Sequence, residues 1–541
     1  MKRKVVSIVL SAVLALSMGV GVFAAETETV AETETVASET AEQEEVSVDG
    51  DVIVSKTDGI VDTAYGKVRG FNDEGTYTFR GIPYAKAERF GMPEAPDSWD
   101  NILNCLVYGP TAPITKMTSP DGGDFIIPHR YWAQNENCQN LNVWTQSLDT
   151  EAKKPVMVWL HGGGYKNGSS IEGVAYDGKN LSEFGDVVVV TVNHRLNVLG
   201  YLDLSQYGDE YKYSGNAGIA DLVAALEWVQ ENIANFGGDP DNVTIFGQSG
   251  GGGKVVSLMS SPAAEGLFDR AIVQSGRKRG MDTETADKVA SLTLENLGLT
   301  AETVDEIKEV DYYTLDAAAT KALEEVGVDW DSVIDEDYQC SELQEWSNEI
   351  PIMVGSVFGE QNCWEALDPN EKNKNDWTEE EVMEKLTEKY GENAEAVLEA
   401  FNKAWPEKND CDAYYVASRA NFTNVLNMRL EAGATKNYDF VVSYESPLDG
   451  GVCLWHCGEI PFVFHNVELV DGAYGGSQDA YTLEEVMSSA WVNFAYNGDP
   501  NGENVPQWST YTEDNLATMI FDTTSGERIA FDTELQEVIN Q

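Results

Sequence analysis

Runs of apolar residues recur along this chain and are separated by segments with helical spacing. The runs at 156–160, 186–192, 243–246 and 350–355 are almost wholly apolar, which is typical of strands buried on both sides of a parallel sheet. The segment 219–236 places its apolar residues on one side of a helix and ends at a Gly-Gly-Asp-Pro stop signal. Because buried strands alternate with helices, the pattern predicts an α/β fold with a large, mostly parallel central sheet flanked by helices.

The first 50 residues do not follow this pattern. A basic stretch at 2–4 precedes an apolar run over 5–23, and small residues stand at the cleavage position, so residues 1–24 are predicted to be a signal peptide. Residues 25–50 are rich in Glu and Thr and include a tandem Ala-Glu-Thr-Glu-Thr-Val repeat. Such a segment has too little apolar surface to offset its ordering entropy, which predicts a disordered acidic tether. Whether the tether binds a surface partner is left open.

The globular domain is expected over residues 51–541. It begins with two short segments, 51–54 and 64–70, which are predicted to form antiparallel edge strands with a turn between them. No later apolar run is long enough to span a bilayer, so no stable membrane insertion is expected.

The charge of the chain limits its partners. It has 35 Lys and Arg against 92 Asp and Glu, a formal net charge of −57. Nucleic acids and anionic membranes are bound through basic patches, so neither is expected as a partner. Together with the predicted signal peptide, this composition suits a soluble, secreted protein.

Seven cysteines are an odd number for a chain expected in an oxidising compartment. At least one thiol must therefore be free or paired outside the chain. The cluster Cys453-Leu-Trp-His456-Cys457 resembles half of a metal site, but no second Cys/His pair lies at ligand spacing. No metal and no cofactor are predicted.

The strongest chemical signal is Gly247-Gln-Ser249-Gly-Gly251, which fits Gly-x-Ser-x-Gly. A short apolar run precedes it and another follows at once, as expected where a strand turns sharply into a helix with the nucleophile at the apex. The alternative is a glycine-rich turn with an incidental serine. Four glycines at 250–253 would weaken a helix, so a compensating role is expected. We expect their unshielded backbone N–H groups to stabilise a negative charge that develops during the reaction.

A second glycine-rich segment, His161-Gly-Gly-Gly164, follows the predicted strand 156–160. An oxyanion needs two or three N–H donors about 3 Å away, and glycine allows the backbone to approach that closely. The loop can supply Gly163 and Gly164, and the residue after the serine can supply Gly250. On its own this loop could be a tight turn, but next to the serine motif it predicts an oxyanion hole.

The general base follows from chain order, which in this fold class is Ser, then acid, then His. Of the five histidines, only His456 and His465 follow Ser249. His456 lies after an apolar run and next to Gly458, in a predicted loop past a strand end, and is the favoured base. His465 lies within Pro-Phe-Val-Phe-His-Asn, where a structural role is expected.

The acid should follow another buried strand. The strand predicted at 350–355 is followed by Glu360, which is the favoured acid. Glu365 and Asp368 lie nearby and are the alternatives, since carboxylates are common on solvated loops.

With these residues in view, the chain resembles the type B carboxylesterases, the family of para-nitrobenzyl esterases and cholinesterases. The similarity extends from about residue 66 to 522 and rests on several separate blocks. These are 79–85, 140–144, 193–200, 215–221, 228–240, 355–360, 456–462 and 497–500.

The resemblance implies an α/β-hydrolase fold with a Ser249-Glu360-His456 triad and an oxyanion hole of Gly163, Gly164 and Gly250. It implies that Ser275 is the accessory buried serine near the triad. It also implies that two acidic helical insertions, 302–346 and 376–404, cover the active-site gorge, the second beginning with a capping box at 378–381.

Two positions depart from the family pattern. Gly250 stands where alanine is usual, and Ala112 stands where the family has the cysteine that pairs with the counterpart of Cys138. Cys105 is the alternative partner for Cys138, which is otherwise expected to be free.

The function predicted from these features is that of a secreted serine carboxylesterase acting through an acyl-enzyme on Ser249, without a cofactor. The substrate is a small-molecule or glycan-linked carboxylic ester. An acyltransferase or amidase on the same scaffold and a non-catalytic adhesion protein of the family are the alternatives. Ser275-Gly-Arg-Lys278 fits Ser-x-x-Lys, but the tyrosine motif that accompanies such a site is missing. Acyl and alcohol preference and oligomeric state are left open.

Overall fold

A computed structural model describes residues 52–115, 128–360 and 370–541. The predicted signal peptide at 1–24 and tether at 25–50 lie outside the described residues and stay predictions. The same holds for Glu365, Asp368 and Cys363.

The described chain is built on a twelve-stranded sheet with the order β1-β4-β5-β7-β9-β8-β10-β11-β14-β15-β18-β19. The strands from β9 to β18 run parallel, whereas β1, β4, β5 and β7 at one end and β19 at the other are antiparallel. Their bounds are β1 Val52–Ile53, β4 Phe71–Asp73, β5 Thr76–Pro83, β7 Asn140–Thr145, β8 Lys154–Leu160, β9 Val188–Val192, β10 Gly238–Gln248, β11 Arg270–Gln274, β14 Ile352–Val357, β15 Asn437–Val442, β18 Ala517–Phe521 and β19 Gly526–Ile529. The predicted parallel sheet is confirmed.

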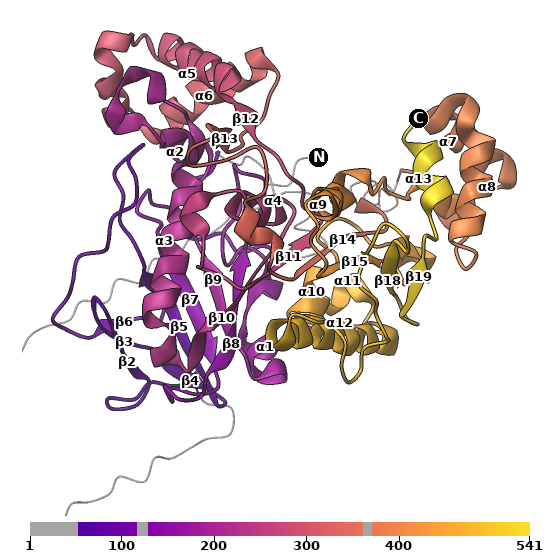
Figure 1. Cartoon of the computed structure of the whole chain (residues 1–541), viewed down its shortest axis with the longest axis horizontal. Coiled ribbons are helices and arrows are strands. Elements are labelled where there is room, and N and C mark those ends of the chain that lie inside the picture. The colour runs from indigo at the N-terminus through magenta and orange to yellow at the C-terminus, as the bar shows by residue number, and fades with distance from the viewer. Residues whose placement is uncertain (1–51, 116–127, 361–369) are drawn as a thin grey trace, which may run out of the picture. The chain divides into compact units, whose positions relative to one another are not determined.

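The sheet lies between two hydrophobic cores, and Figure 1 shows the helices that flank it. Successive side chains of a strand point to opposite faces, so Val156 and Val158 of β8 belong to one core and Met157 and Trp159 to the other. The first core also contains the apolar faces of α3 (Ala217–Asn232) and α4 (Gly250–Met259). The second contains those of α1 (Lys179–Gly185) and α12 (Gln478–Asn497).

The prediction for the N-terminal edge strands was wrong in its pairing. β1 is an edge strand, but it pairs with β4 rather than with the segment 64–70. Within that segment, β3 (Gly66–Arg69) forms a hairpin with β2 (Ile60–Thr63) and belongs to a separate small sheet with β6 (Leu103–Asn104). The turn is closed by the Thr63 hydroxyl, which donates to the Gly66 carbonyl at 2.7 Å. A strand was missed at 60–63 because its four residues are short and mixed in polarity.

Two helical pairs lie at or next to the predicted insertions, and Figure 1 shows them as α5 beside α6 and α7 beside α8. The first pair consists of α5 (Thr283–Leu297) and α6 (Tyr312–Val326), so α5 precedes the insertion predicted at 302–346 and only α6 lies within it. The second consists of α7 (Glu379–Tyr390) and α8 (Ala394–Ala404). The predicted capping box is confirmed, because Thr378 and Glu381 each accept the other's backbone N–H.

The remaining described elements are short or peripheral. They are β12 (Met281–Asp282) with β13 (Val333–Ile334), β16 (Glu445–Ser446) with β17 (Val452–Cys453), and helices α2 (Asn197–Tyr201), α9 (Ala420–Glu431), α10 (Ile460–Val463), α11 (Asp471–Tyr474) and α13 (Thr533–Ile539). Within the described ranges, every helix is too short or too polar to cross a membrane.

Of the two alternatives for Cys138, pairing with Cys105 is not present among the described residues. Cys138 is buried and unpaired among the described residues, and it packs against Ala112 and Leu196 in a small apolar cluster. Cys105 is also buried and unpaired, within a different core. Apolar contact takes the place of a cross-link at this point.

Candidate active site

Ser249 occupies the turn between β10 and α4. Its backbone has φ 56° and ψ −122°, which is a strained conformation for a residue with a side chain. The turn is held because the Ser249 N–H donates to the Gln274 carbonyl at 2.8 Å. The predicted strand–turn–helix geometry around the serine is therefore present.

The glycines around Ser249 are required by close packing. A Cβ at Gly251 would lie 1.9 Å from the Leu160 carbonyl oxygen at the end of β8, and one at Gly247 would lie 2.5 Å from the Gly251 carbonyl carbon. A Cβ at Gly252 would meet the backbone of Gly276 at 2.9 Å. The sequence pattern suggested that the four helical glycines serve anion binding, whereas Gly251 and Gly252 are required by close contact with the backbone at the ends of β8 and β11.

The loop after β8 brings Gly164 against Gly250. Gly163 and Gly164 have φ of 81° and 64°, a region that favours glycine. A Cβ at Gly250 would lie 2.3 Å from the Gly164 carbonyl oxygen, so the alanine usual at this position would force the loop to shift. Gly164, Ser249 and Gly250 line one pocket, and Gly163 precedes them on the same loop as Gly164. Gly164 and Gly250 are thus brought together beside Ser249, and Gly163 adjoins Gly164 in the chain.

Glu360 follows β14 and is buried, and both of its carboxylate oxygens are engaged. Oε1 accepts from the Ser275 hydroxyl at 2.8 Å and from the Val357 N–H at 3.1 Å. Oε2 is hydrogen-bonded to Nδ1 of His456. The backbone supports the same arrangement, because the His456 N–H donates to the Glu360 carbonyl at 2.7 Å. The structure thus brings together Glu360, His456 and Ser275.

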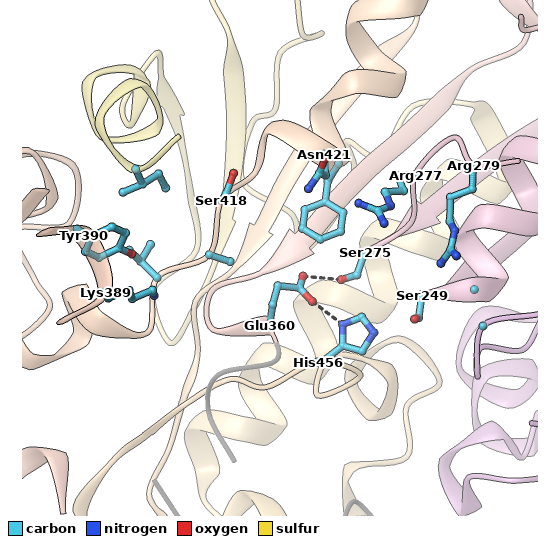
Figure 2. A pocket seen from close by; sticks show the side chains of 16 residues that line it. Ser249, Ser275, Arg277, Arg279, Glu360, Lys389, Tyr390, Ser418, Asn421 and His456 are labelled. Atoms are coloured by element: carbon cyan, nitrogen blue, oxygen red, sulfur yellow. Dashed lines mark hydrogen bonds and ion pairs between the residues drawn. The ribbon is translucent and has the colours of Figure 1, made fainter. Parts of the chain in front are cut away.

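The imidazole of His456 lies between Glu360 and Ser249, and Figure 2 shows its Nε2 edge facing the serine. Burial alone would lower the pKa of His456, but the hydrogen bond and the charge of Glu360, assisted by Glu459, raise that pKa above its ordinary value. Since Nδ1 is bound to the carboxylate, Nε2 is the ring nitrogen on the side of Ser249.

His465 is placed elsewhere. Its ring stacks on Phe184 with centroids 4.3 Å apart, and Nδ1 is hydrogen-bonded to the Ser488 hydroxyl at 3.2 Å. It does not line the pocket that contains Ser249.

Two buried ionisable groups near the site were not predicted from the sequence. Burial and the charge of Glu360 raise the pKa of Glu459 to about 7, while Gln274 donates to its Oε1 at 3.1 Å. Burial lowers the pKa of Lys254 to about 7, and its Nζ donates to the His161 carbonyl at 3.1 Å, at the base of the glycine loop. The available signal was a charged residue inside an otherwise apolar stretch, which is rare without a specific role.

The pocket over Ser249 has a volume of about 500 Å³. Its walls come from the loop after β11, from residues 416–422, and from α7 and α13, and its side chains are shown in Figure 2. Lys389 and Tyr390 of α7 line it, as expected for the second insertion, whereas no described residue of 302–346 does. Across the ranges that the structure describes, no group of three or more His, Cys, Asp or Glu side chains is arranged to hold a metal ion.

Comparison with known proteins agrees with this geometry. The model of the family described as "Carboxylesterase family" matches residues 57–537. The chain is 32% identical to the para-nitrobenzyl esterase of Bacillus subtilis (strain 168), over 86% of this chain and 95% of that protein. It is 30% identical to the phenmedipham hydrolase of Pseudarthrobacter oxydans, over 85% of this chain and 94% of that protein.

Solved structures agree as well. An esterase from the anaerobe Clostridium hathewayi, described as able to hydrolyse aliphatic aromatic polyesters, superposes with a TM-score of 0.84 at 41% identity, covering 91% of this chain and 99% of that one. A thermophilic para-nitrobenzyl esterase gives a TM-score of 0.70 at 30% identity, covering 89% and 99%. The sheet is accordingly that of an α/β-hydrolase, and the chain belongs to the carboxylesterase family of ester-hydrolysing enzymes.

Proposed function

We propose that this protein is a secreted serine carboxylesterase that cleaves carboxylic esters through an acyl-enzyme on Ser249. The observation that carries the proposal is the pairing of Glu360 with Nδ1 of His456 beside a serine held at a strained turn. This arrangement has the nucleophile, base and orienting acid of a serine hydrolase.

In the proposed acylation step, neutral His456 takes the hydroxyl proton of Ser249 while Oγ of Ser249 attacks the ester carbonyl carbon. The carbonyl electrons move onto oxygen, and the backbone N–H groups of Gly163, Gly164 and Gly250 stabilise this oxyanion. When the carbonyl re-forms, the bond to the alkoxy group breaks and His456 gives its proton to the leaving alcohol. Water then attacks the acyl-enzyme in the same way, which releases the carboxylic acid and restores Ser249.

Ser275 has a supporting role in this proposal. Its hydroxyl donates to Glu360 at 2.8 Å, which fixes the position of the carboxylate. The carboxylate in turn keeps the imidazole in the tautomer that has a free Nε2 and stabilises the imidazolium after proton transfer.

Acyl transfer and amide hydrolysis remain the alternative reactions, because they share the first half of this mechanism and differ only in the acceptor or leaving group. A non-catalytic role fits less well, since a binding protein has no need of a strained serine beside a Glu–His pair.

The proposed secretion rests on the predicted signal peptide. N-terminal sequencing of the secreted protein should therefore find a mature N-terminus at Ala25. A chain that retains Met1 would contradict this prediction.

The polyester-hydrolysing relative suggests that esters of aromatic acids belong in a panel of candidate substrates. For this chain we propose only the class of bond that is cleaved, a carboxylic ester. Aryl esters, feruloyl esters and acetylated sugars are suitable members of that panel.

Replacement of Ser249 by alanine should abolish ester hydrolysis, with a loss of about 10⁴-fold or more in kcat, because the nucleophile is removed. The thermal midpoint should change little, since the side chain contributes reactivity rather than packing. Steady-state kinetics, thermal unfolding and peptide mapping after organophosphate labelling measure these effects. Ser275→Ala is the matched control and should retain labelling at Ser249. Labelling that persists in Ser249→Ala and maps to Ser275 would overturn the assignment.

His456→Ala should cost almost as much as Ser249→Ala, and Glu360→Gln should cost less. Because members of a triad act as a unit, His456→Ala with Glu360→Gln should be little worse than His456→Ala alone. His465→Ala is the control and should lower stability while sparing turnover. If the loss in the double variant equals the product of the two single losses, Glu360 does not act through His456. Glu365 or Asp368 would then become the acid to test.

The pH dependence of kcat/KM tests the coupling of His456 with Glu360 independently. His456 must be neutral to accept a proton, so activity should fall as pH drops through its pKa, which Glu360 holds above the ordinary value of about 6.5. Glu360→Gln removes that effect and should move the acid limb of kcat/KM to lower pH. An unmoved limb would contradict the coupling.

A further inference from the structure

The wall of the catalytic pocket carries positive charge in a strongly acidic protein. Of its lining residues, Arg277, Arg279 and Lys389 are cationic and Glu360 alone is acidic. The Glu360 carboxylate is hydrogen-bonded to Ser275, Val357 and His456 rather than to any of these three cations. Since the whole chain has 92 acidic against 35 basic residues, this local excess of cations requires a specific reason.

Arg277 is the clearest case. It comes two residues after Ser275, in the loop that follows β11, and its side chain is exposed at the pocket. In the part of the chain that the structure describes, it has neither a hydrogen bond nor an ion pair. A guanidinium offers five N–H donors in a planar fork that matches a carboxylate, so an unpaired one beside a catalytic serine is suited to an anionic group of the substrate.

The other cationic side chains near Arg277 each form a hydrogen bond to another group of the protein. The Arg279 Nε donates to Asp331 at 2.7 Å, and its guanidinium lies over the Tyr165 ring at 5.9 Å. The Lys278 Nζ is turned to the Cys340 carbonyl at 2.8 Å, and Lys389 donates to the Tyr414 carbonyl. Arg279 is therefore fixed and partly neutralised by Asp331, whereas Arg277 keeps its full charge.

The position of the two arginines suits contact with a bound ester. Figure 2 shows Arg277 and Arg279 on the same side of the pocket as Ser275 and Ser249. A neighbouring hollow shares Arg277, Arg279 and Asn421 with the pocket, so both guanidinium groups can be reached from solvent. A substrate with its ester carbonyl at Ser249 can direct a second polar group along this wall.

We propose that Arg277, supported by Arg279, forms a carboxylate-binding subsite, and that the preferred substrates are esters that also carry a free carboxylate. This inference rests on the proposed esterase function and names its substrate class. The carboxylate can belong to the acyl part, as in half-esters of dicarboxylic acids, or to the alcohol part, as in esters of hydroxy acids. In both cases the reaction at Ser249 is unchanged, and Arg277 contributes binding and orientation.

The test compares substrates that differ only in charge. For the acyl side, monoethyl adipate is compared with its primary amide analogue. For the alcohol side, para-carboxyphenyl butyrate is compared with para-carbamoylphenyl butyrate. Values of kcat/KM are measured for the unmodified enzyme, Arg277→Gln, Arg277→Lys and Lys288→Gln, an exposed cation on α5 that does not line the pocket and serves as the charge-matched control.

The unmodified enzyme should favour the carboxylate over the amide in at least one pair, and Arg277→Gln should reduce that preference on the order of tenfold, the size expected for loss of a charge-assisted hydrogen bond. The amide substrates should be unaffected, Arg277→Lys should restore part of the preference, and Lys288→Gln should leave it intact. Salt should weaken the preference, since the site is open to solvent. The pair that responds identifies the side that carries the carboxylate.

Two results separate failure of this inference from failure of the proposed function. The carboxylate subsite is wrong if the unmodified enzyme cleaves the carbamoyl-bearing esters but shows no preference for either carboxylate-bearing ester. It is also wrong if Arg277→Gln leaves the preference unchanged. In both cases the esterase function stands. If the enzyme cleaves none of the carbamoyl-bearing esters, carboxylate-bearing esters and other aryl esters, the proposed function itself fails, and the subsite fails with it.

Discussion

The active site depends on one close backbone contact, in which the first turn of α4 lies directly against the end of β8. There is no room for a Cβ at Gly251, which would lie 1.9 Å from the Leu160 carbonyl oxygen. This contact sets the angle between β10 and α4 and so holds Ser249 in its strained turn. It also places Gly164 against Gly250, which brings the glycine loop to the serine. Larger residues here would move the nucleophile and the oxyanion donors together.

Electrostatics then give different roles to groups of similar chemistry. Glu360 accepts hydrogen bonds from Ser275, Val357 and His456, which hold both of its carboxylate oxygens in place. Glu459 is also buried, but it lies near the charge of Glu360, and its pKa is raised to about 7. The two carboxyl groups therefore differ in their surroundings, since Glu360 is fully hydrogen-bonded and Glu459 is buried next to a like charge. Burial lowers the pKa of Lys254, under the glycine loop, to about 7.

The sequence allowed prediction of features with a strong local signal. The parallel strands are almost wholly apolar, the elbow has an unusual set of glycines, and only two histidines follow Ser249. It did not predict partners that depend on tertiary contact. The pairing of β1 with β4 rather than with 64–70 is decided by the whole sheet, and the polarity of 60–63 gave no warning of β2. Lys254, Glu459 and Arg277 were missed because a charged residue in the sequence does not reveal whether it is buried, paired or free.

The central claim is that Ser249 forms a covalent acyl intermediate. The most direct measurement uses an aryl N-methylcarbamate, whose carbamoyl-enzyme is hydrolysed slowly enough to isolate by acid quenching. The account predicts release of one equivalent of phenol per chain, matched by one carbamoyl group on the peptide that contains Ser249. It also predicts no such adduct in Ser249→Ala. A carbamoyl group on Ser275 or on another residue, or phenol release that continues without any adduct on Ser249, would contradict the account.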